Sequence, residues 1–242
     1  MNQAAISAKG LCRSFAGKEV LRDCTLSVPR GCVYGLLGRN GAGKTTLLKL
    51  LAGLLRPTAG TAGVLGLDSV RDREAVLRRV GCLIETPVFY EHLSAEENLR
   101  LHLACMGMEE RDPGPELALV GLPAPGGEPV SAFSLGMRQR LAVARAILHR
   151  PEVLLLDEPM NGLDPVGMRE LGAQLRRLSE EWGVTVLLSS HLLSELARTA
   201  HWVGVLEGGR IVRETDTAGL SAGGLEEYFL SALKGGISDG NG

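Results

Sequence analysis

The sequence predicts an α/β fold: a doubly wound core, an antiparallel β subdomain near the N-terminus and an inserted α-helical subdomain. Short apolar runs that are typical of buried strands recur at Val33–Leu37, Val80–Ile84, Val153–Leu156 and Val184–Leu188. Helical patterns separate several of these runs, which is the alternation expected of an α/β core. Residues 87–149 instead combine a helix start signal with leucines at helical spacing, so they predict the insertion.

The N-terminal part of the chain predicts strands followed by a helix. Cys24–Val28 alternates apolar and polar residues, as a half-buried antiparallel strand does, and Pro29–Gly31 turns the chain into the next strand. Leu47–Ala52 is helix-like. Arg56–Gly60 and Gly63 are turn signals that precede the buried run at Val80.

The middle of the chain predicts helices. Ser94–Glu97 fits a capping box, and Leu99, Leu103 and Met106 follow at helical spacing. Pro113–Pro115 and residues 122–127 are expected to break this segment, and a second helix should run from Ser134 to about His149.

The C-terminal part returns to buried parallel strands and closes with a hairpin. The helix between the last two parallel strands carries an apolar stripe made of Met168, Leu171, Leu175, Leu178 and Trp182. Trp202–Glu207 and Arg210–Arg213, joined by two glycines, predict the hairpin. We expect one domain over 1–242, with a core at 1–86 and 150–215, a helical subdomain at 87–149 and a C-terminal segment at 216–242. The glycine-rich end, 235–242, is expected to be disordered.

Bulk composition restricts the function classes. Lys and Arg together number 26 against 28 for Asp and Glu, so no strong positive field favours nucleic acid as a partner. The five cysteines are scattered without a CxxC pair and are typical of reduced thiols. The N-terminus is a poor signal peptide, and the apolar runs are far shorter than the roughly 20 residues that span a bilayer. Any membrane role is therefore expected to come through a partner.

Gly38–Thr46 fits the pattern GxxxxGK(S/T) between a predicted strand and a predicted helix. Its glycines let backbone N–H groups converge on phosphate oxygens, and the following helix directs its positive end to the same place. Lys44 would lie between the β- and γ-phosphates of a nucleoside triphosphate, and the Thr45 hydroxyl would ligate Mg²⁺. This motif alone leaves a kinase, a GTPase, a helicase and a transporter motor open.

Two adjacent carboxylates, Asp157 and Glu158, end the apolar run Val153–Leu156. In an α/β sheet, ligands bind at the carboxyl ends of the strands. Because adjacent residues point differently there, Asp157 can face the metal shared with Thr45 while Glu158 faces the γ-phosphate and activates water.

Ser134 and Gly136 stand at the predicted start of a helix, in Ser134–Arg140. The Ser hydroxyl, the backbone N–H groups and the helix dipole all favour a phosphate at such a position.

Together these motifs resemble the ATP-binding subunit of an ABC transporter, a P-loop NTPase, over nearly the whole chain. Gly38–Thr46 resembles the Walker A loop, Val153–Glu158 the Walker B strand and Phe133–Arg140 the signature motif. Asn161–Asp164 resembles the D-loop, and His191 the switch histidine.

The resemblance implies an ATPase that uses ATP and Mg²⁺. It assigns catalysis to Lys44, Glu158 and His191, and metal binding to Thr45, Asp157 and Glu85. It assigns nucleotide binding to Phe15 (adenine), Gly38, Arg39, Asn40, Gly41, Ala42, Gly43, Lys44, Thr45, Thr46, Glu85, Ser134, Gly136 and Asp164. It further implies a head-to-tail pair with a second copy or another ATPase subunit, an integral-membrane permease subunit, and a cytoplasmic location on the inner face of the membrane.

Two departures from the general family pattern narrow the resemblance. The signature has Leu135 and Met137 where the family usually has Gly and Gln, and Glu85 stands where it usually has the Gln of the Q-loop. Both are similar to the branch that serves bacitracin-type and lantibiotic self-protection exporters, which implies export of an antimicrobial peptide or a similar amphiphilic compound. Three alternatives remain open: an ABC transporter ATPase for another substrate, a soluble ABC-type ATPase that remodels DNA or ribosomes, and a signalling module without transport. A P-loop small-molecule kinase gives no reason for the Ser134 and Asn161 motifs.

Overall fold

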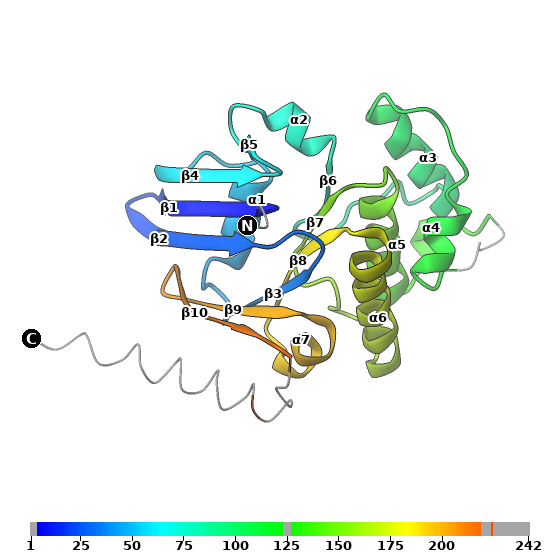
Figure 1. Ribbon diagram of the computed structural model, residues 1–242. Coiled ribbons are helices and arrows are strands. Elements are labelled where there is room, and N and C mark those ends of the chain that lie inside the picture. Colours follow the sequence, from blue (N-terminus) through cyan, green and yellow to red (C-terminus); the bar gives the residue numbers. More distant parts are fainter. Residues whose placement is uncertain (1–3, 123–126, 219–223, 225–242) are drawn as a thin grey trace, which may run out of the picture.

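The computed structural model of the chain describes residues 4–122, 127–218 and 224. Within them, one antiparallel and one mostly parallel β-sheet pack with seven α-helices between and around them, so the α/β architecture is confirmed. Figure 1 shows the antiparallel sheet on one side of the molecule and helices α3 to α6 on the other. No helix in the described part of the chain is long and apolar enough to cross a membrane.

The antiparallel sheet is built near the N-terminus, in the order β2-β1-β4-β5. Its strands are β1 (Ile6–Phe15), β2 (Lys18–Val28), β4 (Ala59–Val64) and β5 (Leu67–Asp68). The strand expected at Cys24–Val28 is the end of the longer β2.

The expected turn around Gly60 and Gly63 is wrong, because both residues lie in β4. Gly60 marks a close approach of two strands instead: its φ is 78°, and a Cβ there would lie 2.1 Å from the carbonyl oxygen of Gly10.

The second sheet has the order β10-β9-β3-β8-β7-β6. Its strands are β3 (Val33–Leu37), β6 (Val80–Leu83), β7 (Val153–Leu156), β8 (Thr185–Ser190), β9 (Trp202–Glu207) and β10 (Arg210–Asp216). All neighbours run parallel except β9 and β10, which form the predicted hairpin. The carboxyl ends of β3, β7 and β8 therefore meet at one edge.

The helices begin and end at recognisable signals. They are α1 (Lys44–Leu51), α2 (Arg73–Leu77), α3 (Ala95–Cys105), α4 (Gly114–Leu119), α5 (Leu135–Ile147), α6 (Pro165–Trp182) and α7 (Leu193–Thr199), with a 3₁₀ turn at Val130–Ala132. The capping box at Ser94 and Glu97 is formed as predicted. The break in the helical segment lies between the end of α3 and the start of α4. Pro113–Pro115 marks the start of α4, because Pro113 is its N-cap and proline is tolerated in the first turn of a helix.

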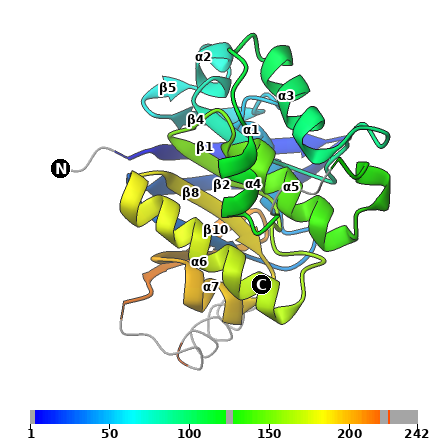
Figure 2. The ribbon, with the colours of Figure 1, turned by 90° about the vertical axis from the view of Figure 1, so that its right-hand side faces the viewer.

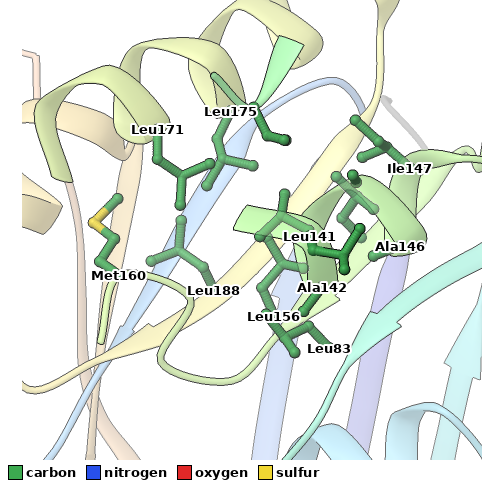
Figure 3. Close-up of a cluster of buried hydrophobic side chains, with 14 of the residues drawn as sticks. Leu83, Leu141, Ala142, Ala146, Ile147, Leu156, Met160, Leu171, Leu175 and Leu188 are labelled. Atoms are coloured by element: carbon green, nitrogen blue, oxygen red, sulfur yellow. The ribbon is translucent and has the colours of Figure 1, made fainter. Parts of the chain in front are cut away.

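Alternate residues of the parallel strands face two hydrophobic clusters. Val153 and Leu155 of β7 pack toward α1 and the antiparallel sheet, whereas Leu154 and Leu156 pack toward α5 and α6. Figure 3 shows the second cluster, where side chains of α5 and α6 meet Leu156 and Leu188. Figure 2 shows α5 and α6 lying over this face of the sheet. The sheet is thus covered on both faces, so a ligand can reach it only at the ends of its strands.

Two members of the predicted apolar stripe of α6 are not fully buried. Met168 packs against the core but is only partly buried. Leu171, Leu175 and Leu178 belong to the core, but Trp182, at the end of the helix, is 60% exposed. The subdomain boundaries expected at 86/87 and 149/150 remain predictions. The expected disorder at 235–242 falls outside the described residues.

Candidate functional site

The loop between β3 and α1 forms a cradle of backbone groups. Gly43 is the N-cap of α1, with φ of 109°, and no side chain caps the first turn. A Cβ at Gly43 would lie 2.9 Å from the Leu21 side chain, and one at Gly38 would lie 2.7 Å from the Leu206 carbonyl oxygen. Glycine therefore allows the loop to lie against β2 and β9, and the N–H groups that begin α1 are left for an anion.

Lys44 is only 6% exposed and holds its ammonium group beside this loop. Its Nζ donates to the Gly38 carbonyl oxygen at 2.6 Å and lies 3.2 Å from Oε1 of Glu158. The charge is thus placed between the cradle and the carboxyl end of β7. A cavity of about 350 Å³ opens there, lined by Val20, Arg39, Asn40, Gly41, Gly43, Lys44, Thr45, Thr46, Asp157 and Glu158.

Asp157 joins three elements at the cavity. Its Oδ2 accepts a hydrogen bond from Thr45 Oγ1 at 2.6 Å, and its Oδ1 accepts one from Ser189 Oγ at 2.6 Å. Hydroxyl and carboxylate oxygens are the ligands that Mg²⁺ prefers. The donor set and the glycine-lined loop therefore fit a magnesium ion beside a phosphate chain.

Glu158 has a left-handed backbone, with φ of 47°, which is uncommon for a residue other than glycine. Its N–H donates to Ser189 Oγ at 2.9 Å, and its carbonyl oxygen accepts from Gln139 Nε2 at 3.2 Å. Its Oε2 lies 2.9 Å from Nδ1 of His191. The carboxylate is therefore held between an ammonium and an imidazole, where it can accept a proton or orient a water molecule.

The signature and D-loop residues do not line this cavity. Ser134 caps α5, its Oγ accepting from Met137 N at 3.2 Å, and Asp164 caps α6, its Oδ1 accepting from Gly167 N at 2.8 Å. Gly136 lies beside the D-loop, since a Cβ there would be 3.2 Å from the Gly162 carbonyl oxygen. Within the chain, the two caps stabilise helix starts.

Phe15 and Glu85 also lie outside the cavity lining. Phe15 ends β1, is 40% exposed and has the Arg13 guanidinium carbon 4.4 Å from its ring centroid. Glu85 forms an ion pair with Lys49 of α1 instead of contacting Thr45 or Asp157. Among the described residues, no group of three or more His, Cys, Asp or Glu side chains forms a metal site. Metal binding by Glu85 stays a prediction.

Three residues at the site were not anticipated. Val20 lines the cavity, Ser189 contacts both carboxylate residues, and Gln139 supports the Glu158 carbonyl. Ser189 had a signal, because it is a polar residue at the end of a buried strand that precedes His191. No local sequence pattern indicates Val20, because its position depends on how the antiparallel sheet packs over the loop.

A larger cavity, of about 600 Å³, lies at the opposite ends of β7 and β8, between Arg30, Glu116, Arg150 and Trp182. No predicted site residue lines it. Size therefore does not identify the site, and the convergence of Lys44, Thr45, Asp157 and Glu158 does.

The family described as ABC transporter matches residues 21–161. The chain is 40% identical, over 86% of its length and 69% of the relative, to the bacitracin transport ATP-binding protein BcrA of Bacillus licheniformis. It is 39% identical, over 94% of its length and 97% of the relative, to the lantibiotic transport ATP-binding protein SrtF of Streptococcus pyogenes.

Solved structures share the fold. An ATP-binding subunit of an ABC transporter has a TM-score of 0.81 and 30% identity, covering 93% of this chain and 99% of the other. The bacterial ABC transporter cassette MJ0796, solved as a dimer, has a TM-score of 0.80 and 23% identity, covering 89% and 100%.

Proposed function

Since this chain belongs to the ABC transporter ATP-binding family, whose members bind and hydrolyse ATP, we propose that it powers the export of an antimicrobial peptide through a separate permease. The observation that carries the ATPase part is the meeting of Lys44 and the carboxylates of Asp157 and Glu158 at one cavity. The peptide part is supported by relatives named for bacitracin and lantibiotic transport.

In the proposed reaction, Lys44 and the N–H groups of the cradle bind the phosphates of ATP. Thr45 and Asp157 would hold Mg²⁺, which would neutralise charge on the phosphate oxygens. The Glu158 carboxylate would accept a hydrogen bond from the attacking water. His191 would contact the γ-phosphate, and its Nδ1, 2.9 Å from Glu158 Oε2, orients that carboxylate. Oε1 of Glu158 lies 3.2 Å from Lys44 Nζ, so the Lys44 ammonium would exchange this ion pair for phosphate when ATP binds.

Adenine and metal assignments complete the proposed site. We assign adenine stacking to Phe15, because the residue remains 40% exposed with Arg13 over its ring. Glu85 is proposed as a further ligand of Mg²⁺ or its water, and it would have to exchange its ion pair with Lys49 for that role.

The site is proposed to be completed by a second copy, or a paired ATPase subunit, in a head-to-tail arrangement. Ser134, Gly136 and Asp164 do not line the cavity of their own chain, yet Ser134 begins a helix of 13 residues and is exposed. The hydroxyl and the N–H groups at this helix start suit the γ-phosphate held by the opposing cradle. Hydrolysis would remove that contact and let the pair open.

Mixing two inactive variants tests this arrangement. Lys44→Ala disables a cradle, and Ser134→Arg disables a signature helix. A mixed head-to-tail dimer combines both defects in one site and leaves the other site intact. We expect the mixture to recover ATP turnover that neither variant has alone, measured by phosphate release.

A mixture of Lys44→Ala with Glu158→Gln serves as the control, because both changes lie in the cradle half and every site of the mixed dimer stays defective. Equal turnover in the two mixtures would contradict a site shared between copies.

The permease is proposed to be an integral-membrane subunit that holds this chain on the cytoplasmic face of the cell membrane. Copurification of the two proteins in vesicles, followed by ATPase assays with bacitracin and a lantibiotic, tests the substrate class. Stimulation by either peptide is expected. Unchanged turnover with both, together with no protection of cells, would overturn the peptide assignment and leave the ATPase standing.

A second candidate substrate is a small amphiphilic drug. The chain is 39% identical, over 88% of its length and 69% of the relative, to the daunorubicin resistance ATP-binding protein DrrA3 of Streptomyces coeruleorubidus. The same vesicles, assayed with daunorubicin in place of peptide, distinguish the two candidates.

A further inference from the structure

A connecting segment, residues 85–93, joins β6 to α3 and touches two helices that belong to opposite halves of the proposed site. At its start, Glu85 has φ of 66° and is paired with Lys49, on the helix that follows the cradle. Farther along, the segment is attached to α5, which begins at the Ser134 cap. The segment therefore links the cradle helix α1 with the signature helix α5.

Arg138 makes the main attachment to α5. Its Nη1 and Nη2 donate to Oε1 and Oε2 of Glu91 at 2.5 and 2.6 Å, a two-pronged pair. Its Nε lies 3.4 Å from the carbonyl oxygen of Phe133, a long hydrogen bond to the residue just before Ser134. One guanidinium thus contacts both the connecting segment and the entrance of the signature helix.

Arg145, two turns along the same helix, makes a second attachment. Its Nη1 donates to the Val88 carbonyl oxygen at 2.9 Å, and its guanidinium carbon lies 4.8 Å from the Phe89 ring centroid. From α3, Asn98 accepts from Tyr90 N at 2.8 Å and donates to Tyr90 O at 3.0 Å. Residues 88–91 are consequently fixed to the helices, whereas the Glu85 end contacts α1 through one side chain.

The chemistry of the Glu91 contact requires arginine. A guanidinium is planar and presents its donors as a fork, so it can bond both carboxylate oxygens with Nη1 and Nη2 while Nε points elsewhere. Lysine presents a compact charge and cannot reproduce this arrangement. The hydrogen bond from Arg138 is also the main reason that the pKa of the Glu91 carboxyl is lowered.

We propose that Arg138 is a positioning residue for ATP turnover: it fixes the Ser134 end of α5 to the connecting segment, so that the segment and the signature helix move together relative to α1. This inference rests on the proposed function, because Ser134 acts on the nucleotide only when a second copy faces it. A force applied to the segment, for example by the permease, would then displace Ser134 directly.

ADP affinity and ATP turnover distinguish a positioning role of Arg138 from a purely structural role, because a purely structural role would change both together. ADP lacks the γ-phosphate that Ser134 is proposed to contact, so ADP binding depends on the cradle and not on Arg138. ATP turnover depends on where Ser134 lies, and a displacement of about 1 Å can lower a rate roughly a hundredfold.

A double-mutant cycle between Glu91→Gln and Arg138→Lys tests the pair. We expect each single change to lower ATP turnover roughly tenfold to a hundredfold and the double variant to be no slower than Arg138→Lys alone, because both changes break one interaction. The dissociation constant for ADP and the Tm should stay at the wild-type values. Glu91→Gln, a neutral isostere on an exposed residue, keeps the test valid if Arg138→Lys folds poorly.

The ion pair between Arg177 and Glu181 on α6 is the matched control, since its Nε to Oε2 distance is 2.8 Å and both residues are exposed. Arg177→Lys and Glu181→Gln should turn over ATP as the wild type does. Independent effects of Glu91→Gln and Arg138→Lys, wild-type turnover in both, or a parallel loss of ADP binding would overturn the proposal. An absence of turnover in the wild type itself would count against the proposed function instead.

Discussion

At the scale of single residues, Ser189 connects the two carboxylates of the site. It is fully buried at the end of β8, donates to Asp157 and accepts from the Glu158 N–H. Its hydroxyl therefore fixes the side chain of one acid and the backbone of the other. We propose Asp157 as a Mg²⁺ ligand, and loss of a group that orients a metal ligand typically lowers metal affinity roughly ten- to hundredfold.

Ser189→Ala is predicted to raise the Mg²⁺ concentration needed for half-maximal ATPase activity roughly ten- to hundredfold. The physical reason is that Asp157 loses the donor to its Oδ1 and can rotate away from Thr45. Magnesium titrations of turnover measure this effect. Ser190→Ala is the control, because Ser190 Oγ accepts from Leu192 N and, in the described part of the chain, makes no hydrogen bond to Asp157. A wild-type magnesium requirement in Ser189→Ala would refute the role of the hydroxyl.

The difference between Asp157 and Ser189 also shows what the sequence could predict about the site. Asp157 and Glu158 follow an apolar strand, and the adjacent sequence alone indicates their place at a sheet edge. Ser189 reaches them because β7 and β8 are parallel neighbours in register, Leu156 opposite Leu188. That pairing joins segments about 30 residues apart, and no local pattern states it.

At the scale of elements, burial lowers the pKa of two histidines, one in α3 and one just after the end of α5. Burial lowers the pKa of His102, in α3, from 6.5 to about 4, with the charge of Arg145 and His149 as further causes. Burial is also the main reason that the pKa of His149 is lowered. Protonation of either imidazole would place charge beside arginines in a poorly solvated contact.

The free energy of unfolding is predicted to fall as the pH is lowered from about 6.5 to about 4. In this window the unfolded chain binds a proton at His102 and the folded chain does not, so acid favours unfolding. Above about pH 6.5 neither state binds this proton, and the free energy of unfolding keeps its full value with respect to His102. Urea midpoints measured between pH 7 and pH 4 test it. His102→Gln should reduce the pH slope, and an unchanged slope in that variant would contradict the assignment.

Elements that begin with a hydrogen-bonding pattern inside one turn could be predicted from the sequence. Elements whose residues depend on contacts with distant strands could not. The capping box of Ser94 identified the start of α3, because its hydrogen bonds are made within one turn. The glycines of β4 locally predict a turn, but Gly60 is needed because the strand lies close to the backbone of Gly10. Trp182 fits the stripe of α6 by spacing, but it is the last residue of the helix and is 60% exposed.

At the scale of the whole molecule, the cradle cavity draws on segments from distant parts of the chain. The loop around Lys44, the end of β7 and Val20 of β2 all line it. A nucleotide bound there would contact both sheets and would be lost on unfolding, so binding and global stability are linked.

ATP with Mg²⁺ at about 100 times its dissociation constant is predicted to raise the free energy of unfolding by about 2.7 kcal/mol. Lys44→Ala should show little of this stabilisation at the same concentration, because the buried ammonium that is proposed to bind the phosphates is gone. Thermal unfolding with and without nucleotide measures both proteins. Equal Tm increases in the two would show that the nucleotide binds elsewhere.

We propose that Glu158 acts on water at a cavity where Lys44 binds phosphate. The most direct test is steady-state phosphate release by wild type and Glu158→Gln, with ATP affinity measured on both. The amide keeps the size of the side chain but removes its capacity to accept a proton, so we predict retained ATP binding and a turnover lowered by about 10²- to 10⁴-fold. Wild-type turnover in Glu158→Gln, with ATP still bound, would contradict the proposed role of Glu158.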